Sequence, residues 1–517
     1  MALADIVSVT ISAVSVSPTR PGFGTPMIAA YHTHYTDVVR TYNLPNDLLS
    51  DGFLATDAAF LMATALKSQN PSVNKFKVGR RATAYTEAFT LSVSTSTAGD
   101  SVKFKLEGTA FSYTLVTPTL VATGGRTLTV AGSAKTITAS SGSFLADGWA
   151  VGQTVTVSGT TSNNSAKGAI TTLTATVMTV SNSCSDEGPL SSAATLTANG
   201  PSSAGAANAL CAAINTAAIA TLAAVTATTN TLTVGAAAAG KVLHWAAWDP
   251  TKVDLENTTA DPGLAADLAT IAAADNDWYG LLLDSQGINQ VHAAATYANA
   301  NKKLFGYDCS DTVAIGSGSS DVFSVLKGLA YEHSYGVYNG QDNKQYSAAA
   351  AMGNRFPFDP GGDTWAFKTL KGVSPDTFTA TQYTNLMGKN ANIYSTIAGL
   401  NMLQFGKSAD GEFIDTIRFI DWLQSRIQIN VFSALAAMPK IPFTDAGVSV
   451  VKGMILAALQ DGERAGGLTP GSSLVTAPLV SSISSIDKGN RNLPNVQFSA
   501  QLAGAIHSVS ITGVISV

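Results

Sequence analysis

The sequence predicts a multidomain protein of mixed α/β and α+β class, with strand extensions at both ends and a large β-rich insertion. Three observations support this prediction. Helical and strand patterns alternate over residues 53–85, and the same alternation resumes over residues 245–350. The residues between them form short alternating runs rich in Thr, Ser, Val, Ala and Gly. The two terminal segments alternate apolar and polar side chains, which is the period of a half-buried strand.

The α/β pattern follows the order of its elements. A helical stretch at 54–71 ends at Asn70-Pro71, because proline does not continue a helix, and an alternating stretch at 73–81 follows it. Later helices are predicted at 262–277, 288–303 and 321–333, and short apolar strands at 278–285, 304–311 and 334–339. Such alternation indicates a parallel sheet. We therefore predict one discontinuous α/β domain, built from residues 26–85 and 245–350.

The segment 86–244 is predicted to be a separate β-rich insertion domain. Its composition breaks with the helix-strand alternation on both sides, and its one clear helical pattern covers residues 204–217. Within it, residues 143–181 have the pattern of a smaller β module, which we place at about 120–195.

Residues 351–517 are predicted to form a C-terminal domain. Its strongest helix covers 411–438, and a second helix at 444–465 ends at Gly466-Gly467. The stretch 359–368, with its Asp, Gly and aromatic residues, is interpreted as a turn that leads into a strand, or as a packing point between elements or subunits. The apolar stripe of the first helix consists of Phe413, Ile417, Ile420, Leu423, Ile427, Val431 and Leu435.

Both chain ends are predicted to be strand arms. Residues 1–25 form the N-terminal arm, expected to pack with the C-terminal domain, and residues 505–517 form the C-terminal arm. Neither strand has an evident partner in the sequence, although an ordered end normally needs one. The apolar faces of the two arms are Val7, Val9 and Ile11, and Val509, Ile511, Ile515 and Val517.

Composition excludes several classes of protein. Only 13% of the 517 residues are charged, the net charge is −5 and no Lys/Arg cluster is present, so we expect no nucleic-acid partner. No run reaches the ~18 apolar residues that span a bilayer, so we expect no membrane insertion. The start of the chain lacks the pattern of a signal peptide, which predicts synthesis in the cytoplasm. So little charge favours surfaces buried between subunits.

The sequence contains no strong motif for catalysis or for metal binding. His32 and His34 lie on one face of a predicted strand, but no third metal ligand follows at a recognisable spacing, so a structural or interface pair is favoured. Cys184, Cys211 and Cys309 fit neither a disulfide framework nor a metal site. We expect no catalytic, metal-binding or cofactor-binding residue and no cofactor.

A resemblance extends over the whole chain and is most specific at "GVSPDTFTATQYTNLMGKNANIY", residues 372–394. With the helix at 411–438 and both terminal segments, this stretch resembles a tail sheath protein of contractile (myophage) phages. The resemblance implies a tail-sheath-like core and a subunit of stacked hexameric rings around a tail tube, whose contraction drives the tube through the host envelope. It implies the tail tube protein, baseplate and tail terminator proteins as partners. It also implies a place in the virion tail, after assembly in the host cytoplasm.

The resemblance also assigns roles to residues. The two terminal arms would add strands to the sheets of neighbouring subunits, which gives the seven apolar arm residues a partner. The helices at 411–438 and 444–465 would face the tail tube, with Arg418, Arg426, Lys452 and Glu463 as candidate contacts.

Two other functions stay open at this point. One is a β-rich host-binding adhesin with residues 86–244 as its receptor module. The other is a metal-dependent hydrolase that uses Asp284 and Asp308, which follow predicted parallel strands at the edge where open α/β sheets bind ligands.

Overall fold

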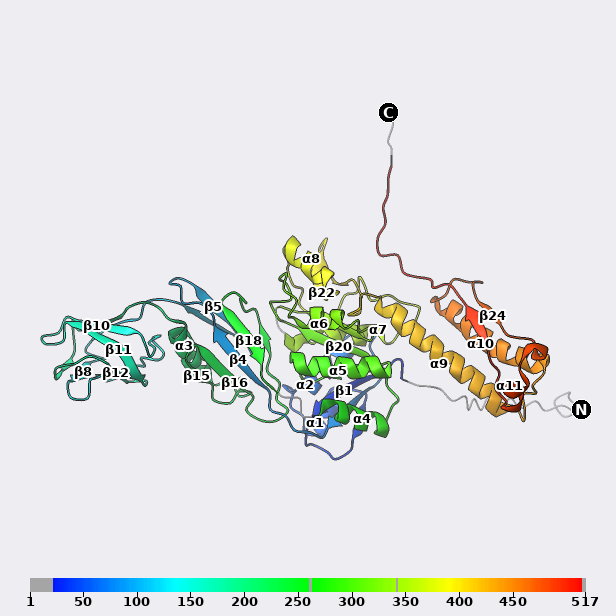
Figure 1. Cartoon of the computed structure of the whole chain (residues 1–517), viewed down its shortest axis with the longest axis horizontal. Coiled ribbons are helices and arrows are strands. Elements are labelled where there is room, and N and C mark those ends of the chain that lie inside the picture. Colours follow the sequence, from blue (N-terminus) through cyan, green and yellow to red (C-terminus); the bar gives the residue numbers. More distant parts are fainter. Residues whose placement is uncertain (1–21, 260–262, 341–342, 514–517) are drawn as a thin grey trace, which may run out of the picture. The chain divides into compact units, whose positions relative to one another are not determined.

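The computed structural model describes residues 22–259, 263–340 and 343–513 (Figure 1). The chain forms two compact units. The main unit comprises Gly24–Pro357 and Trp365–Phe413. The C-terminal unit comprises Phe358–Thr364 and the chain from Ile414 onwards, together with residues 22–23.

An eight-stranded sheet forms the centre of the main unit, in the order β2-β3-β1-β19-β20-β21-β22-β23. The six central strands are parallel, and each edge strand, β2 and β23, is antiparallel to its neighbour. The central strands are almost fully buried, as expected where helices cover both faces of a parallel sheet. The strands are β1 (Pro26–Tyr31), β2 (Val39–Tyr42), β3 (Phe76–Arg81), β19 (Gly280–Leu283), β20 (Leu304–Cys309), β21 (Ser334–Tyr338), β22 (Asn392–Ile397) and β23 (Leu400–Gln404).

Helices connect these strands. Apolar side chains of α4, α5 and α6 pack on the sheet residues Met27, Leu281 and Phe305 and form one core. On α8, Thr379 and Gln382 form a reciprocal cap that fixes the start of the helix. The helices of the main unit around this sheet are α1 (Asn46–Ser50), α2 (Ala58–Lys67), α4 (Leu264–Ala274), α5 (Ile288–Asn301), α6 (Val322–Gly328), α7 (Ser347–Arg355) and α8 (Ala380–Gly388).

The strand order reverses at β1. The chain first passes from β1 to β3 on one side, and after the insertion it continues through β19, β20, β21 and β22 on the other side. In open α/β sheets, such a switch point leaves a crevice at the carboxyl ends of the strands. The crevice in this sheet therefore lies between β1 and β19.

The insertion begins with two small sheets that enclose a core of their own with α3 (Ser203–Ala217). The side chain of Ser202 caps α3 by accepting a hydrogen bond from the Gly205 amide, 2.9 Å away. His244 ties this part to α7, because its ring lies 3.0 Å from Glu107 and 2.9 Å from the Tyr346 hydroxyl. The strands are β4 (Ala88–Val93), β5 (Ser101–Leu106), β6 (Thr109–Thr114), β15 (Thr226–Thr228), β16 (Thr231–Gly235), β17 (Trp245–Ala246) and β18 (Val253–Asn257).

A second β structure is nested in the insertion. Its eight strands pair in the order β13-β8-β9-β12-β11-β10-β14-β7, and they enclose a separate core around Phe144 and Trp149. The strands are β7 (Thr119–Val121), β8 (Leu128–Ala131), β9 (Thr136–Ala139), β10 (Thr154–Ser158), β11 (Ser165–Leu173), β12 (Val177–Val180), β13 (Glu187–Leu190) and β14 (Thr195–Ala198). The first and last strands, β7 and β14, are paired neighbours, so the module begins and ends at one place.

The C-terminal unit is built on two long helices, α9 (Ile414–Ala437) and α10 (Asp445–Ala465). Their shared core contains Phe419, Leu423, Ile455 and Leu459. Gly466 ends α10 with a φ of +88°, a conformation that favours glycine. After it come β24 (Leu474–Thr476), α11 (Ser485–Gly489) and β25 (Gln497–Ser499), and the two strands form an antiparallel pair.

The predicted fold class is confirmed: the structure is a mixed α/β multidomain protein with several sheets. The helices and strands expected at 54–85, 262–339, 204–217, 411–438 and 444–465 are present. The predicted domain boundaries stay a prediction, and the compact units differ from them. The main unit includes the insertion as well as the α/β part, and β17 and β18, at 245–257, pair with β5 and β4 of the insertion. The sheet continues through β22 and β23, so residues 365–413 lie in the main unit and not with α9 and α10.

Candidate functional site

Asp284 fills the switch-point crevice of the large sheet. It follows β19, and its carboxylate accepts a hydrogen bond from the Tyr31 amide at the end of β1, at 2.9 Å. The guanidinium of Arg81, at the end of β3, lies 3.2 Å from the same carboxylate and 3.7 Å from that of Asp267. All three charged side chains are buried. Protein groups thus occupy the place where open α/β sheets usually bind ligands.

Asp308 is held in a different way. Its carboxylate accepts a hydrogen bond from the Ala348 amide, 3.1 Å away, in the first turn of α7. Burial raises the pKa of Asp308 to about 7. Because each aspartate has its own protein partners, neither is arranged as a ligand for a shared ion. Within residues 22–259, 263–340 and 343–513, no group of three His, Cys, Asp or Glu side chains is suited to hold a metal.

The histidine pair follows β1. The rings of His32 and His34 are stacked with their centroids 5.6 Å apart, and His32 also contacts Tyr35 and Phe53. Burial, with a smaller effect of His34, lowers the pKa of His32 to about 4. His32 is therefore neutral at physiological pH and packs in an aromatic cluster.

The Gly-rich turn at 359–362 packs inside the C-terminal unit. Gly361 has a φ of +94°, and a Cβ at this position would lie 2.7 Å from Phe419 and 2.9 Å from Gly467. Only glycine therefore allows the turn to approach α9 and the end of α10 so closely. The structure thus shows the expected turn, and this turn is also a packing point between elements of one chain.

Arg418 on α9 fixes the same turn. Its guanidinium donates hydrogen bonds to the carbonyl oxygens of Phe358 and Phe23, at 2.8 and 3.2 Å, and lies 3.8 Å from Asp363. The side chain is only 1% exposed. Arg418, a predicted tube contact, thus lies inside the unit, where it presents no charge to a partner.

The other three predicted contacts are more accessible. Arg426 is 43% exposed and pairs with Asp461 of α10 at 2.9 Å. Lys452 is half-buried on α10. Glu463 accepts hydrogen bonds from Ser473 and the Gly471 amide, and the bond from Ser473 contributes most to lowering its pKa. Glu463 thus fixes the loop that leads to β24.

An apolar groove runs along α9. It has a volume of about 450 Å³, and α9 and β25 supply most of its walls. Ile420 and Phe498, which line it, are 49% and 50% exposed. Further along α9, Phe432 and Leu435 are also exposed, as is Met438 directly after the helix. Contiguous exposed apolar side chains of this kind are typical of interaction surfaces.

Comparison with known families identifies this unit. Residues 414–515 match the family model described as "E217 tail sheath protein gp31-like, C-terminal domain". These residues form a tail sheath C-terminal domain of that family. The match supports a structural role in a phage tail sheath for the chain that carries this sheath domain.

Solved structures resemble the chain only distantly. A sheath tail protein from Desulfitobacterium hafniense is 8% identical with a TM-score of 0.41, covering 91% of this chain and 93% of that chain. A sheath tail protein from Listeria innocua is 10% identical with a TM-score of 0.37, covering 88% of each chain. A chain of the anti-feeding prophage baseplate is 15% identical with a TM-score of 0.36, covering 49% of this chain and 72% of that one.

TM-scores below 0.5 do not establish a common fold, so the assignment rests on the family match. No curated protein matches the chain. Of the helices that the structure describes, none has the length and apolar character that crossing a membrane requires.

The C-terminal arm of the sheath domain stays bonded to its unit as far as His507, whose Nε2 lies 2.9 Å from the Thr364 hydroxyl. Residues 503–513 form no helix or strand, and Val509 and Ile511 are 71% and 88% exposed. Ile515 and Val517 lie outside the described residues, as do Val7, Val9 and Ile11 of the N-terminal arm. Strand pairing by these seven residues stays a prediction.

Sequence reasoning missed the buried role of Arg418 and the groove beside Ile420. Asp415, Arg418 and Asp421 recur every three residues on α9, a spacing that is typical of a polar helix face. Nothing in that spacing shows that the turn at 359–363, far away in the sequence, covers this face.

Proposed function

We propose that the chain is the structural subunit of a contractile phage tail sheath. It polymerises as stacked hexameric rings around the tail tube, and its contraction drives the tube through the host envelope. The observation that carries this proposal is the family match of residues 414–515. The proposal places the protein in the virion tail, after assembly in the host cytoplasm, and assigns it no catalytic residue and no cofactor.

Exposed apolar surface supports the polymer. The C-terminal unit has an apolar groove on α9 and an arm in which the side chains of Val509 and Ile511 are 71% and 88% exposed. Soluble monomers rarely keep such surface open to water. In a sheath, neighbouring subunits would cover it.

The arms provide the connection between subunits. The sheet of β24 and β25 has only two strands among the described residues, so each strand has an outer edge whose backbone groups an added strand can pair with. Each arm would extend such a sheet in a neighbour, with Val7, Val9 and Ile11 or Val509, Ile511, Ile515 and Val517 on its apolar face. Hydrogen bonds of the backbone would then join the rings while they move.

The tail tube protein is the proposed partner of α9 and α10, and baseplate and tail terminator proteins are the partners at the two ends of the sheath. Arg426, Lys452 and Glu463 are the candidate tube contacts. Single exposed charge pairs contribute only about 0–1 kcal/mol. A repeated set of such weak contacts holds the tube and still releases it during contraction.

Electron microscopy of the purified protein tests the proposal. We expect tubes or stacked rings, and addition of a chelator should not change them. A monodisperse monomer at high concentration, with both termini intact, would contradict the proposal. A trimer that binds cells or glycans would favour the adhesin instead.

A further inference from the structure

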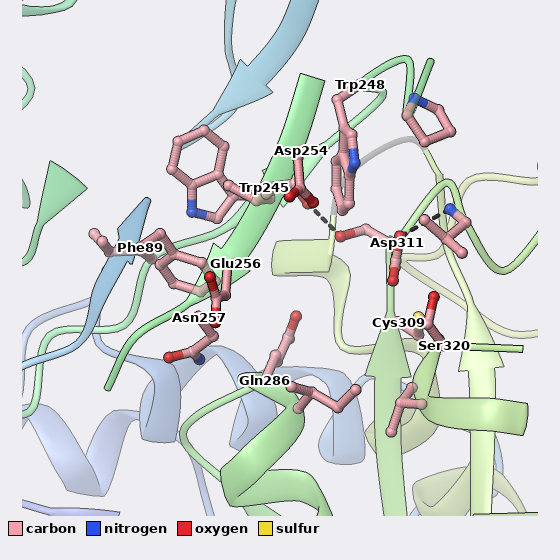
Figure 2. A pocket seen from close by; sticks show the side chains of 18 of the residues that line it. Phe89, Trp245, Trp248, Asp254, Glu256, Asn257, Gln286, Cys309, Asp311 and Ser320 are labelled. Atoms are coloured by element: carbon pink, nitrogen blue, oxygen red, sulfur yellow. Dashed lines mark hydrogen bonds between the residues drawn. The ribbon is translucent and has the colours of Figure 1, made fainter. Parts of the chain in front are cut away.

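A pocket lies where the insertion meets the large sheet, within the main unit. Its volume is about 420 Å³, which is in the range of small-molecule sites (Figure 2). Trp245, Trp248 and β18 form its wall on the insertion side. Gln286 and residues 308–311, which follow β19 and β20, form the other wall. The pocket therefore opens at the carboxyl ends of parallel strands, beside the crevice that Arg81 and Asp284 fill.

Four carboxylates line this pocket: Asp254 and Glu256 of β18, which are exposed, Asp308 of β20, which is buried, and Asp311 after β20. No Lys or Arg is among the described residues that line it, and Asp254, Glu256 and Asp311 form no ion pair within the described part of the chain. Lys389, whose charge acts on Asp311, is paired with Asp321 at 2.8 Å and donates to two carbonyl groups.

The carboxylates also repel each other. Burial raises the pKa of Asp311 to about 6; the charges of Asp321 and Asp254 add to this effect, while the Val313 amide and the charge of Lys389 oppose it. The only hydrogen bond that the structure shows to its carboxylate comes from the Val313 amide, at 2.8 Å. A positive group between Asp254 and Asp311 would relieve this repulsion.

Aromatic rings complete the pocket. In Figure 2, Phe89 and Trp245 lie to one side of Asp254, and Trp248 lies to its other side, above Asp311. The faces of tryptophan and phenylalanine attract cations through the ring quadrupole, most strongly where water is excluded. The amides of Asn257 and Gln286 add polar groups to the same walls.

We propose that this pocket binds an organic cation with primary ammonium groups, of the polyamine class. The carboxylates would accept the ammonium hydrogens, and the aromatic rings would cover the methylene chain. The same chemistry is found in a free polyamine and in a lysine side chain of another protein, so both sources are tested. The proposed site lies in the main unit and requires neither the sheath domain nor polymerisation.

Calorimetric titration of the full chain with spermidine at low ionic strength tests the site. We expect saturable binding that weakens with added salt, because the contact is between charges. Glu256→Gln, Asp311→Asn and Trp248→Leu should each weaken binding by about tenfold or more. Asn at position 311 still accepts the hydrogen bond from Val313, and melting curves of each variant confirm that it is folded.

Glu332→Gln is the matched control. It removes one negative charge from the loop before β21, at the amino end of the sheet, and should leave spermidine binding unchanged. A second titration uses N-acetyl-lysine methylamide. Binding of spermidine alone indicates a free polyamine, whereas equal binding of both indicates a lysine side chain.

Three results would overturn the proposal. One is the absence of saturable binding by either amine. Another is binding that the pocket variants and Glu332→Gln reduce equally, which would mean that only net charge matters. The last is binding of a neutral disaccharide without binding of either amine.

Discussion

Arg81 and Asp284 form a buried ion pair at the switch point of the large sheet, with Nη1 and Oδ1 3.2 Å apart and neither side chain more than 2% exposed. The pair joins the ends of β3 and β19, and Asp284 also accepts a hydrogen bond from β1, which lies between them. An aspartate that sequence reasoning considered for catalysis therefore holds three strands together.

Removing one partner of this pair should destabilise the main unit strongly. Arg81→Met leaves the buried carboxylate of Asp284 without its cation, and such a change costs about 3–5 kcal/mol of the free energy of unfolding. Urea denaturation measures the loss. The neighbouring Arg80→Met is the control, because Arg80 donates only to exposed carbonyl groups and should cost little. If both changes lower the free energy of unfolding equally, the ion pair does not contribute specifically to stability.

Asp308→Asn should change how stability depends on pH. The folded state keeps this carboxyl protonated up to about 7, whereas its ordinary pKa is 3.8. Wild-type stability therefore falls as pH rises between these values and is constant above them. Asparagine does not ionise, so the stability of the variant relative to the wild type should rise as pH rises over this interval. At about 1.4 kcal/mol per pKa unit, the gain is a few kcal/mol at most.

Melting temperatures of both proteins across this pH range measure the gain. Subtracting the two curves removes the contribution of other buried acids, such as Glu87. Parallel curves would show that Asp308 ionises normally in the folded chain.

The nested module should be removable. Leu120 pairs with Leu196 in neighbouring strands, so a short Gly/Ser linker in place of residues 120–195 closes the gap without stretching the chain. We expect the shortened protein to form tubes and to keep the melting transition of the main unit, because the module has its own core. If the shortened protein stays folded but forms no tubes, the module is part of the polymer contact.

The C-terminal arm should be needed for assembly and not for folding. Deleting residues 505–517, or introducing Ile511→Pro, removes backbone donors from an added strand. Because Ile511 is 88% exposed, Ile511→Pro should leave the melting temperature of the subunit unchanged, while polymerisation is lost. The deletion also removes the hydrogen bond between His507 and Thr364, so its effect on melting should be small and its effect on assembly complete. Ile511→Val keeps the backbone donor and should assemble. A lowered melting temperature with normal assembly would show that the arm pairs within its own chain.

Charge reversal should affect folding at Arg418 but tube binding at the exposed candidates on α9 and α10. Lys452→Glu and Arg426→Glu should weaken binding of the tail tube in a salt-dependent way and leave folding intact. Arg418→Glu should instead unfold the C-terminal unit, because it buries a negative charge beside Asp363 and two carbonyl groups. Tube co-sedimentation and melting curves distinguish these effects. Normal tube binding by both exposed variants would place the contact elsewhere.

The sequence determined the local elements of this protein. The apolar stripe that begins near Ile417 predicted α9, and alternation with short apolar runs predicted β19, β20 and β21. These patterns are readable because the geometry of a helix or strand repeats every few residues. For the same reason, the β-rich composition of residues 86–244 separated the insertion from the α/β part.

Only the tertiary structure decided which distant segments meet. Val337 pairs with Asn392, which adds β22 to the sheet and assigns residues 365–413 to the main unit. Arg418 is buried because the turn at 359–363 covers it, although its spacing on α9 is that of an exposed residue. The pocket likewise joins Trp248 with Asp311 across intervening elements. Local periodicity gives each element a polar and an apolar face, but complementarity with a remote surface decides what covers that face.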